Sequence, residues 1–285
     1  MGVTDCILYL TTPEFVPCLV AGILYGIGAI ILYDKSKRHK FFLSYFYLGS
    51  GALLYSVAEV FDLVWNRSEG EKSDFPLHAS LLLLTFGGTF FLLALFRLLE
   101  TWQQVGMREG RRSLSMLAPG AILIAMLISM VGDVLMVQQD QAAEHDDEDV
   151  AKTRVALQLQ TAGAVMNLVI LVVFFVFLGS LARRRKGQSV LAIVLACLGG
   201  LILIRWVYNS YLLGSMLMHV MQAEDADYSV DLPGWPVFIG LFIVPEILAI
   251  ALSILYDLTQ VKNGVEQLQH HGFVHLNEAQ GMQHV

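Results

Sequence analysis

Five ionisable residues stand inside long apolar stretches of this sequence: Glu59, Asp62, Asp133, Arg205 and Glu246. A charge at the centre of a membrane helix costs roughly 2.5–3.5 kcal/mol on insertion scales, so such residues usually face the interior of a bundle and find partners. Arg205 is the one cation fully inside an apolar stretch, and its planar guanidinium suits a bidentate contact with a carboxylate. We therefore expect Arg205 to pair with Asp133 or Glu246.

These charges fall at similar heights when each helix is given about 1.5 Å per residue. Two interpretations remain open: an ion pair that fixes helix packing, and a polar cavity that accepts a lipid head group or another amphiphile. Pro245 precedes Glu246 and kinks its helix, which suits a site that opens. The candidate cavity comprises Glu59, Asp133, Asn167, Arg205, Tyr208, Asn209 and Glu246.

Apolar helices must carry these residues. Only 15% of the 285 residues are charged, against roughly 25% in soluble proteins, and the charges gather between long uncharged runs. A helix needs about 20 apolar residues to cross the hydrocarbon core of a bilayer. The sequence predicts an all-α polytopic membrane protein whose seven transmembrane helices span roughly 15–33, 41–65, 75–99, 117–137, 157–182, 189–216 and 233–257.

Basic residues gather in alternate loops, at 35–40, 108–112 and 183–186. The positive-inside rule assigns those loops to the cytosol, which places the N-terminus outside and the C-terminus in the cytosol. The expected organisation is a short outer N-terminus (1–14), a seven-helix transmembrane domain (15–258) and a polar cytosolic tail (259–285).

The outer loops hold two further features. Asn66-Arg67-Ser68 is a glycosylation sequon, so Asn66 is a glycosylation candidate close to the membrane. The acidic run 144–149 has the charge to attract cations, although a solvated loop explains it as well.

Several classes of protein are disfavoured by the sequence. A net charge of −7 does not suit nucleic-acid binding. No phosphate-binding loop and no serine elbow occur, and the last apolar stretch has no lysine for a retinal Schiff base. Intramembrane histidines are too few for a zinc hydrolase. We expect no enzyme activity, no metal and no cofactor, and the pattern assigns no oligomeric state.

Several residue pairs and motifs occur along the chain: Gly49 with Glu59, Gly132-Asp133-Val134 with Gln138, Gly163 with Asn167, and Arg205 to Tyr208 followed by Glu224, Tyr228 and Asp231. In these residues the chain resembles the fungal lipid-translocating exporter family, the RTA-like or aminocholesterol-resistance group, over about residues 15–258. Departures occur at Asn209, Leu212 and Val244, where the family usually has other residues, so the chain resembles a divergent branch.

The resemblance implies seven helices, a plasma-membrane or endomembrane location, and movement of, or resistance to, sphingoid bases or sterol-like compounds. The leading hypothesis is therefore a translocation, export or resistance factor whose partners are membrane lipids and an amphiphilic small molecule. The alternative is a non-catalytic seven-helix membrane sensor or receptor, in which the basic loops form a surface for a cytosolic partner.

The predicted sidedness is testable by cysteine labelling. Cysteines introduced within 138–156 should react with a membrane-impermeant maleimide on intact cells, and cysteines at 183–186 should react only after permeabilisation. The unmodified chain, which has three cysteines, sets the background. The reverse pattern would overturn the orientation.

Overall fold

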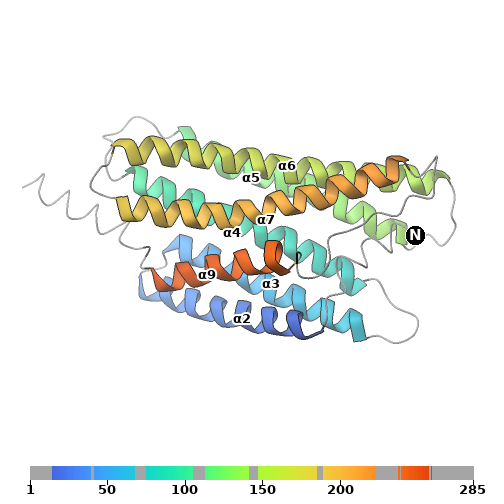
Figure 1. The fold of residues 1–285 in the computed structure, drawn as a ribbon, viewed down its shortest axis with the longest axis horizontal. Helices are drawn as coiled ribbons and strands as arrows, with labels where there is room; N and C mark the ends of the chain where they lie inside the picture. The colour runs from blue at the N-terminus through green and yellow to red at the C-terminus, as the bar shows by residue number, and fades with distance from the viewer. Residues whose placement is uncertain are drawn as a thin grey trace, which may run out of the picture.

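The computed structural model describes residues 15–39, 42–67, 75–104, 113–140, 147–184, 189–222, 237, 239–256 and 258. All regular secondary structure in these ranges is helical. Six α-helices run along one common direction, and a seventh begins with a π-helical turn (Figure 1). The helices are α2 (Phe15–Arg38), α3 (Leu43–Arg67), α4 (Phe75–Gln104), α5 (Ser113–Asp140), α6 (Asp147–Arg184), α7 (Ser189–Gln222), and η1 (Ile239–Ile243) continuing into α9 (Val244–Leu255).

The predicted fold class is confirmed: the chain is an all-α polytopic membrane protein with seven helices. Five helices contain segments long and apolar enough to cross a membrane: Leu19–Arg38, Ala79–Gln103, Leu117–Met136, Ala151–Arg183 and Val190–Met218. The other two are α3, which carries Glu59, Asp62 and Arg67 in its second half, and the shorter apolar segment Ile239–Leu255. The predicted N-terminus 1–14 and tail 259–285 lie outside the described residues.

Most helices extend beyond their predicted ends, and α6 and α7 do so by the most residues at one end. Residues 147–156 were expected in a loop but form the first turns of α6, and α7 continues to Gln222. The stretch 147–156 contains neither glycine nor proline, and its acidic start suits the positive end of a helix dipole. Hydropathy marks where a helix leaves the apolar region, whereas backbone hydrogen bonding continues until a helix-breaking residue intervenes.

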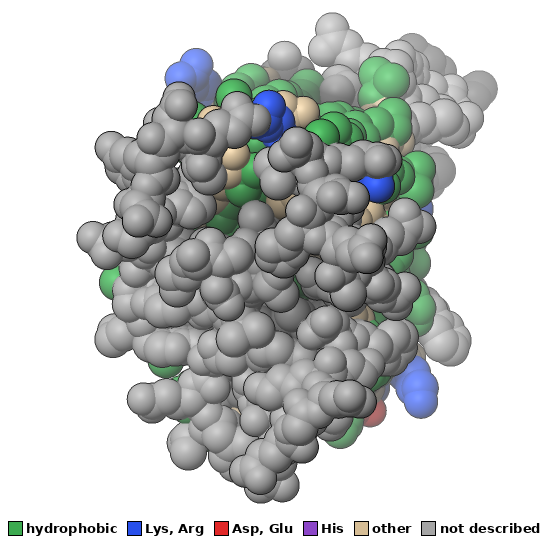
Figure 2. Space-filling view, turned by 90° about the vertical axis from the view of Figure 1, so that its right-hand side faces the viewer, with side chains coloured by type: hydrophobic (Ala, Val, Ile, Leu, Met, Phe, Trp, Pro, Cys, Tyr) green, Lys and Arg blue, Asp and Glu red, His purple; other side chains and the backbone are tan. Residues whose placement is uncertain are grey.

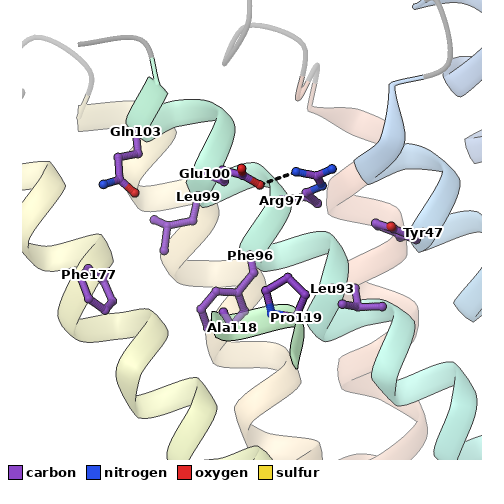
Figure 3. Close-up of a pocket in the computed structure, with 10 residues that line it drawn as sticks. All are labelled: Tyr47, Leu93, Phe96, Arg97, Leu99, Glu100, Gln103, Ala118, Pro119 and Phe177. Carbon is purple, nitrogen blue, oxygen red and sulfur yellow. Dashed lines mark hydrogen bonds and ion pairs between the residues drawn. The ribbon is translucent and has the colours of Figure 1, made fainter. Parts of the chain in front are cut away.

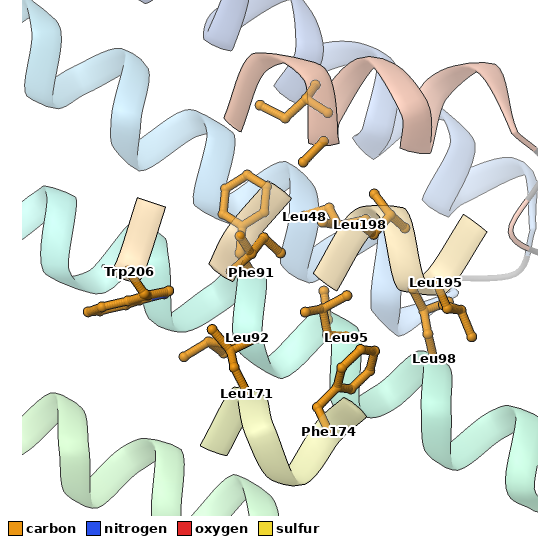
Figure 4. Packing of buried hydrophobic residues seen from close by; sticks show 14 of the residues in the cluster. Leu48, Phe91, Leu92, Leu95, Leu98, Leu171, Phe174, Leu195, Leu198 and Trp206 are labelled. Carbon is orange, nitrogen blue, oxygen red and sulfur yellow. The ribbon is translucent and has the colours of Figure 1, made fainter. Parts of the chain in front are cut away.

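Consecutive helices pack against one another, and the last helix closes the bundle against α2 and α7. In Figure 1, α9 lies beside α2 although more than 200 residues separate the two helices in the chain. Large aromatic and leucine side chains fill the space between the helices, among them Phe91, Phe174 and Trp206 (Figure 4). This packing brings residues from both ends of the sequence to one interior.

The outer surface of the bundle is apolar. Side chains such as Ile30, Leu117 and Val176 are more than 60% exposed, and hydrophobic side chains dominate the described flanks in the end-on view of Figure 2. Exposed apolar faces of this extent suit contact with lipid, which supports the membrane assignment.

Gly132 allows α5 and α6 to lie close together. A Cβ added at Gly132 would lie 2.8 Å from the carbonyl oxygen of Ala156 and 3.0 Å from the backbone nitrogen of Gln160. Both are backbone atoms, so α6 would have to move away from α5. Gly132 is therefore required by the contact itself, as small residues are at membrane helix interfaces generally.

Gly132→Ala should destabilise the protein by about 1–3 kcal/mol, because overpacking forces a backbone shift. The matched control is Gly120→Ala on the same helix, where nothing lies within 4 Å of the added Cβ. The control should be neutral or slightly stabilising, since alanine favours the helix by up to about 1 kcal/mol. Thermal unfolding of both variants in one detergent measures the difference, and equal midpoints would contradict the close contact.

Candidate functional site

A buried ion pair joins α7 to α9. Nε of Arg205 lies 2.5 Å from Oε1 of Glu246, and the two side chains are 6% and 3% exposed. The sequence offered Arg205 two partners, Asp133 and Glu246, and the structure places Glu246 against it. This pairing neutralises two charges that would each be costly alone in an apolar interior.

Two tyrosines complete the coordination of the pair. The Tyr55 hydroxyl of α3 accepts a hydrogen bond from Nη1 of Arg205. The Tyr25 hydroxyl of α2 donates to Oε2 of Glu246 over 3.1 Å. Nη2 of Arg205 also donates to the carbonyl oxygen of Leu84 in α4, at 3.3 Å. One ion pair therefore holds together side chains or backbone from five helices.

Aromatic rings surround the guanidinium. Its central carbon lies 4.7 Å from the ring centroid of Tyr55 and 4.7 Å from that of Phe242, distances at which a cation and an aromatic face attract. Gly88 of α4 makes room for the group, because a Cβ there would lie 2.5 Å from Nη1 of Arg205. The cluster is thus packed shut by apolar and aromatic side chains.

The turn before Glu246 is not an ordinary α-helix. Pro245 has no N–H for the carbonyl of Leu241, so the α-helical hydrogen-bond ladder cannot continue through this point. The chain instead forms the π-helical turn η1 at 239–243, directly before Pro245. The kink that the sequence predicted from Pro245 corresponds to this turn, and π-turns frequently accompany functional sites.

Asp133 belongs to a separate polar contact. Its Oδ1 accepts a hydrogen bond from Nε2 of Gln160 at 2.7 Å, and its Oδ2 accepts one from Oγ1 of Thr85 at 3.1 Å. These bonds join α5 to α6 and α4. The predicted single cluster is therefore divided into two in the structure, one around Glu246 and one around Asp133.

The remaining predicted residues lie around these clusters. Glu59 is buried on α3 beside Gly22 of α2. Asn167 is 2% exposed on α6, and its Oδ1 has no hydrogen-bond partner among the described residues. Tyr208 is buried, whereas Asn209 is half-buried. Asn66 lies in the last turn of α3, and its side chain is not among those that the structure describes.

Among the pockets in the described part of the chain are two whose lining includes neither Arg205 nor Glu246. One is an apolar groove of about 480 Å³ between α7 and the start of the last helix, and Tyr208 lines it. The other, of about 420 Å³, lies where α4 ends and α5 begins. Figure 3 shows this second pocket, which we call the α4–α5 pocket; its lining consists of Tyr47, Leu93, Phe96, Arg97, Leu99, Glu100, Gln103, Ala118, Pro119 and Phe177.

The α4–α5 pocket has a polar end and an apolar end. Arg97, Glu100 and Gln103 lie toward the end of α4, and Leu93, Phe96 and Pro119 lie deeper along the helices (Figure 3). Nη1 of Arg97 is 2.5 Å from Oε2 of Glu100, and the two side chains are 43% and 15% exposed. This arrangement matches the two parts of an amphiphile, a head group and a chain.

Sequence reasoning missed the α4–α5 pocket. The available signal is Arg97-x-x-Glu100 directly after the uncharged run 75–96, a spacing that places both charges on one helix face. The remaining walls come from Tyr47, Pro119 and Phe177 on other helices, and no local pattern in the sequence brings them to Arg97.

The fold and these sites define an all-α polytopic membrane protein with a closed internal ion pair and a mixed apolar and charged pocket near one end of the bundle. Comparison with protein-family models, with curated proteins and with solved structures finds no match to this chain. The resemblance to the lipid-translocating exporters therefore stays a prediction.

Arg205→Leu should sharply reduce the yield of folded protein. The variant leaves the Glu246 carboxylate buried without its cation, and breaking a buried pair costs roughly 3–5 kcal/mol. Adding Glu246→Gln should restore much of the yield, measured by size-exclusion chromatography of a fluorescent fusion in detergent.

Asp133→Asn serves as the matched control, because Asp133 contacts Gln160 and Thr85. Combined with Arg205→Leu, it should restore nothing. Normal yield of the single Arg205 variant would contradict the importance of the pair, and rescue by the Asp133 change alone would assign Arg205 a different partner.

Proposed function

We propose that this protein binds amphiphilic lipids and acts in their translocation, export or resistance. The observation that carries the proposal is the α4–α5 pocket, whose lining combines apolar walls with one charged pair. A ligand site usually consists of mostly apolar walls with a few placed polar groups in some 300–1,000 Å³, and about 420 Å³ falls in that range.

The position of the pocket supports a lipid ligand. Arg97 precedes the end of α4 by seven residues, which corresponds to about 10 Å of helix. The charged pair then lies near the boundary between hydrocarbon and head groups, and the apolar walls extend toward the bilayer centre. By the predicted sidedness, this is the cytosolic leaflet.

The finer identity of the ligand follows the resemblance described above. Sphingoid bases and sterol-like compounds are the proposed classes, and the plasma membrane or an endomembrane is the proposed location. Handling of such compounds is a binding and transfer task, so the proposal involves no catalysis and no cofactor.

A specific observation favours a second candidate, a membrane sensor or receptor. The Arg205–Glu246 pair is buried, with side chains that are 6% and 3% exposed, and it is not part of the lining of the two pockets described above. A ligand bound at the α4–α5 pocket would then act by shifting helices rather than by passing between them. α4 connects the two sites, since it carries both Arg97 and the Leu84 carbonyl that Arg205 contacts.

Filling the α4–α5 pocket should prevent amphiphile binding. Ala118→Trp places a large ring where a ligand would lie, so photolabelling by photoactivatable single-chain lysophospholipid and sphingoid-base analogues should fall about tenfold, as for a ligand that loses roughly 1.4 kcal/mol. Labelled peptides, identified by mass spectrometry, should map to 93–103 and 118–119 in the unmodified protein.

The matched control is Leu117→Trp, at the neighbouring residue, which is 67% exposed and does not line the pocket. It should label as the unmodified protein does. Equal labelling of both variants would remove the pocket from the proposal. In reconstituted vesicles, accelerated lipid movement would favour translocation, and binding without movement would favour the sensor.

A further inference from the structure

We propose that the α4–α5 pocket selects a zwitterionic phospholipid head group, one that carries a phosphate and a cationic amine in the same molecule. This inference rests on the proposed amphiphile binding, and for the α4–α5 pocket it ranks zwitterionic phospholipids above the singly charged sphingoid bases that the family resemblance suggests. It comes from the two charges on the pocket wall and from the aromatic side chains beside them.

A ligand of a single charge would disturb the pair already present. A lone ammonium would compete with Arg97 for Glu100, and a lone phosphate would add a second anion beside Glu100. The two groups are already 2.5 Å apart. A zwitterion avoids both problems. Its phosphate would lie at Arg97 and its amine at Glu100, so each ligand charge would lie beside a side chain of opposite charge.

Arg97 has donors to give to a phosphate. A guanidinium has five N–H donors in a fixed planar arrangement, and the hydrogen bond to Glu100 comes from Nη1. The Arg97 side chain is 43% exposed, which leaves space for the paired contacts that arginine makes with phosphate oxygens.

The amine would meet both a carboxylate and aromatic rings. Glu100 supplies the negative charge, and Tyr47, Phe96 and Phe177 contribute rings to the same lining. Cations bind over aromatic faces within about 6 Å, and quaternary ammonium groups are recognised by such rings. Leu93 and Pro119 then continue the wall toward the bilayer centre, where the first part of an acyl chain would lie (Figure 3).

The experiment compares single-chain lipids that share one acyl length and differ in charge. Purified full-length protein in a nonionic detergent binds a fluorescent single-chain amphiphile, which is displaced by lysophosphatidylcholine, by lysophosphatidic acid or by an alkyltrimethylammonium salt. We expect the zwitterion to displace the probe at about tenfold lower concentration than either singly charged lipid, as for one added charge-assisted contact.

Two neutralising variants should shift the preference in opposite directions. Arg97→Gln should weaken the zwitterion about tenfold and bring the cationic lipid level with it. Glu100→Gln should weaken the zwitterion similarly and bring the anionic lipid level with it. Opposite shifts cannot arise from partial unfolding, which would weaken all three lipids together.

The matched control is Arg38→Gln, which removes an arginine from the exposed helical pair Arg38–Asp34, outside the pocket lining. It should leave the order of the three lipids unchanged. Equal displacement by all three lipids, with Ala118→Trp still abolishing binding, would overturn the zwitterion inference alone. Displacement that is insensitive to Ala118→Trp would overturn the proposed function.

Discussion

The low solvating power of a bilayer interior makes the Arg205–Glu246 pair the contact on which the rest of the bundle depends. Neither charge is tolerated there alone, so each fixes the position of the other, and the surrounding groups complete their coordination. Tyr25, Tyr55 and the Leu84 carbonyl then anchor α2, α3 and α4 to the same point. The glycine at position 88 leaves the space that the guanidinium occupies, since a Cβ there would lie 2.5 Å from Nη1 of Arg205.

The cluster around Arg205 and Glu246 lies in the interior of the bundle, whereas the α4–α5 pocket lies near one end. In the cluster, the charged groups and the two tyrosine hydroxyls contact one another, and apolar and aromatic side chains surround them. In the pocket, the charged pair is partly exposed and adjoins apolar walls. α4 spans the roughly 20 Å between Leu84 and Arg97 as one continuous helix. A ligand that alters the tilt of α4 at the pocket would therefore act on the donor–acceptor geometry around Arg205, and this is a physical route by which binding and bundle closure are coupled.

Hydropathy along the chain predicted the helices because membrane insertion is decided by local composition, and it predicted that Arg205 needs a carboxylate because an isolated charge is costly anywhere in the bilayer. It did not distinguish Glu246 from Asp133, since both lie at suitable depth and only the packing of α9 between α2 and α7 decides between them. The helical start of α6 at Asp147 was missed because polar residues continue a helix as readily as apolar ones do. The α4–α5 pocket was missed because Tyr47, Pro119 and Phe177 join Arg97 only through tertiary packing.

The value of the buried pair is clearest for the last helix. Segment Ile239–Leu255 has 17 residues, about 25 Å of helix against a hydrocarbon core of about 30 Å. Within lipid, apolar side chains gain little by leaving the hydrocarbon for a neighbouring helix, so association depends on close packing and on polar contacts. Close packing is present where Gly28 of α2 meets Ile250 of α9, at a position where a Cβ would lie 2.6 Å from the isoleucine side chain. Such contacts fix the distance between the two helices. They do not fix the rotation of α9 about its own axis or its height in the bilayer. Glu246, held by Arg205 on one side and Tyr25 on the other, determines both.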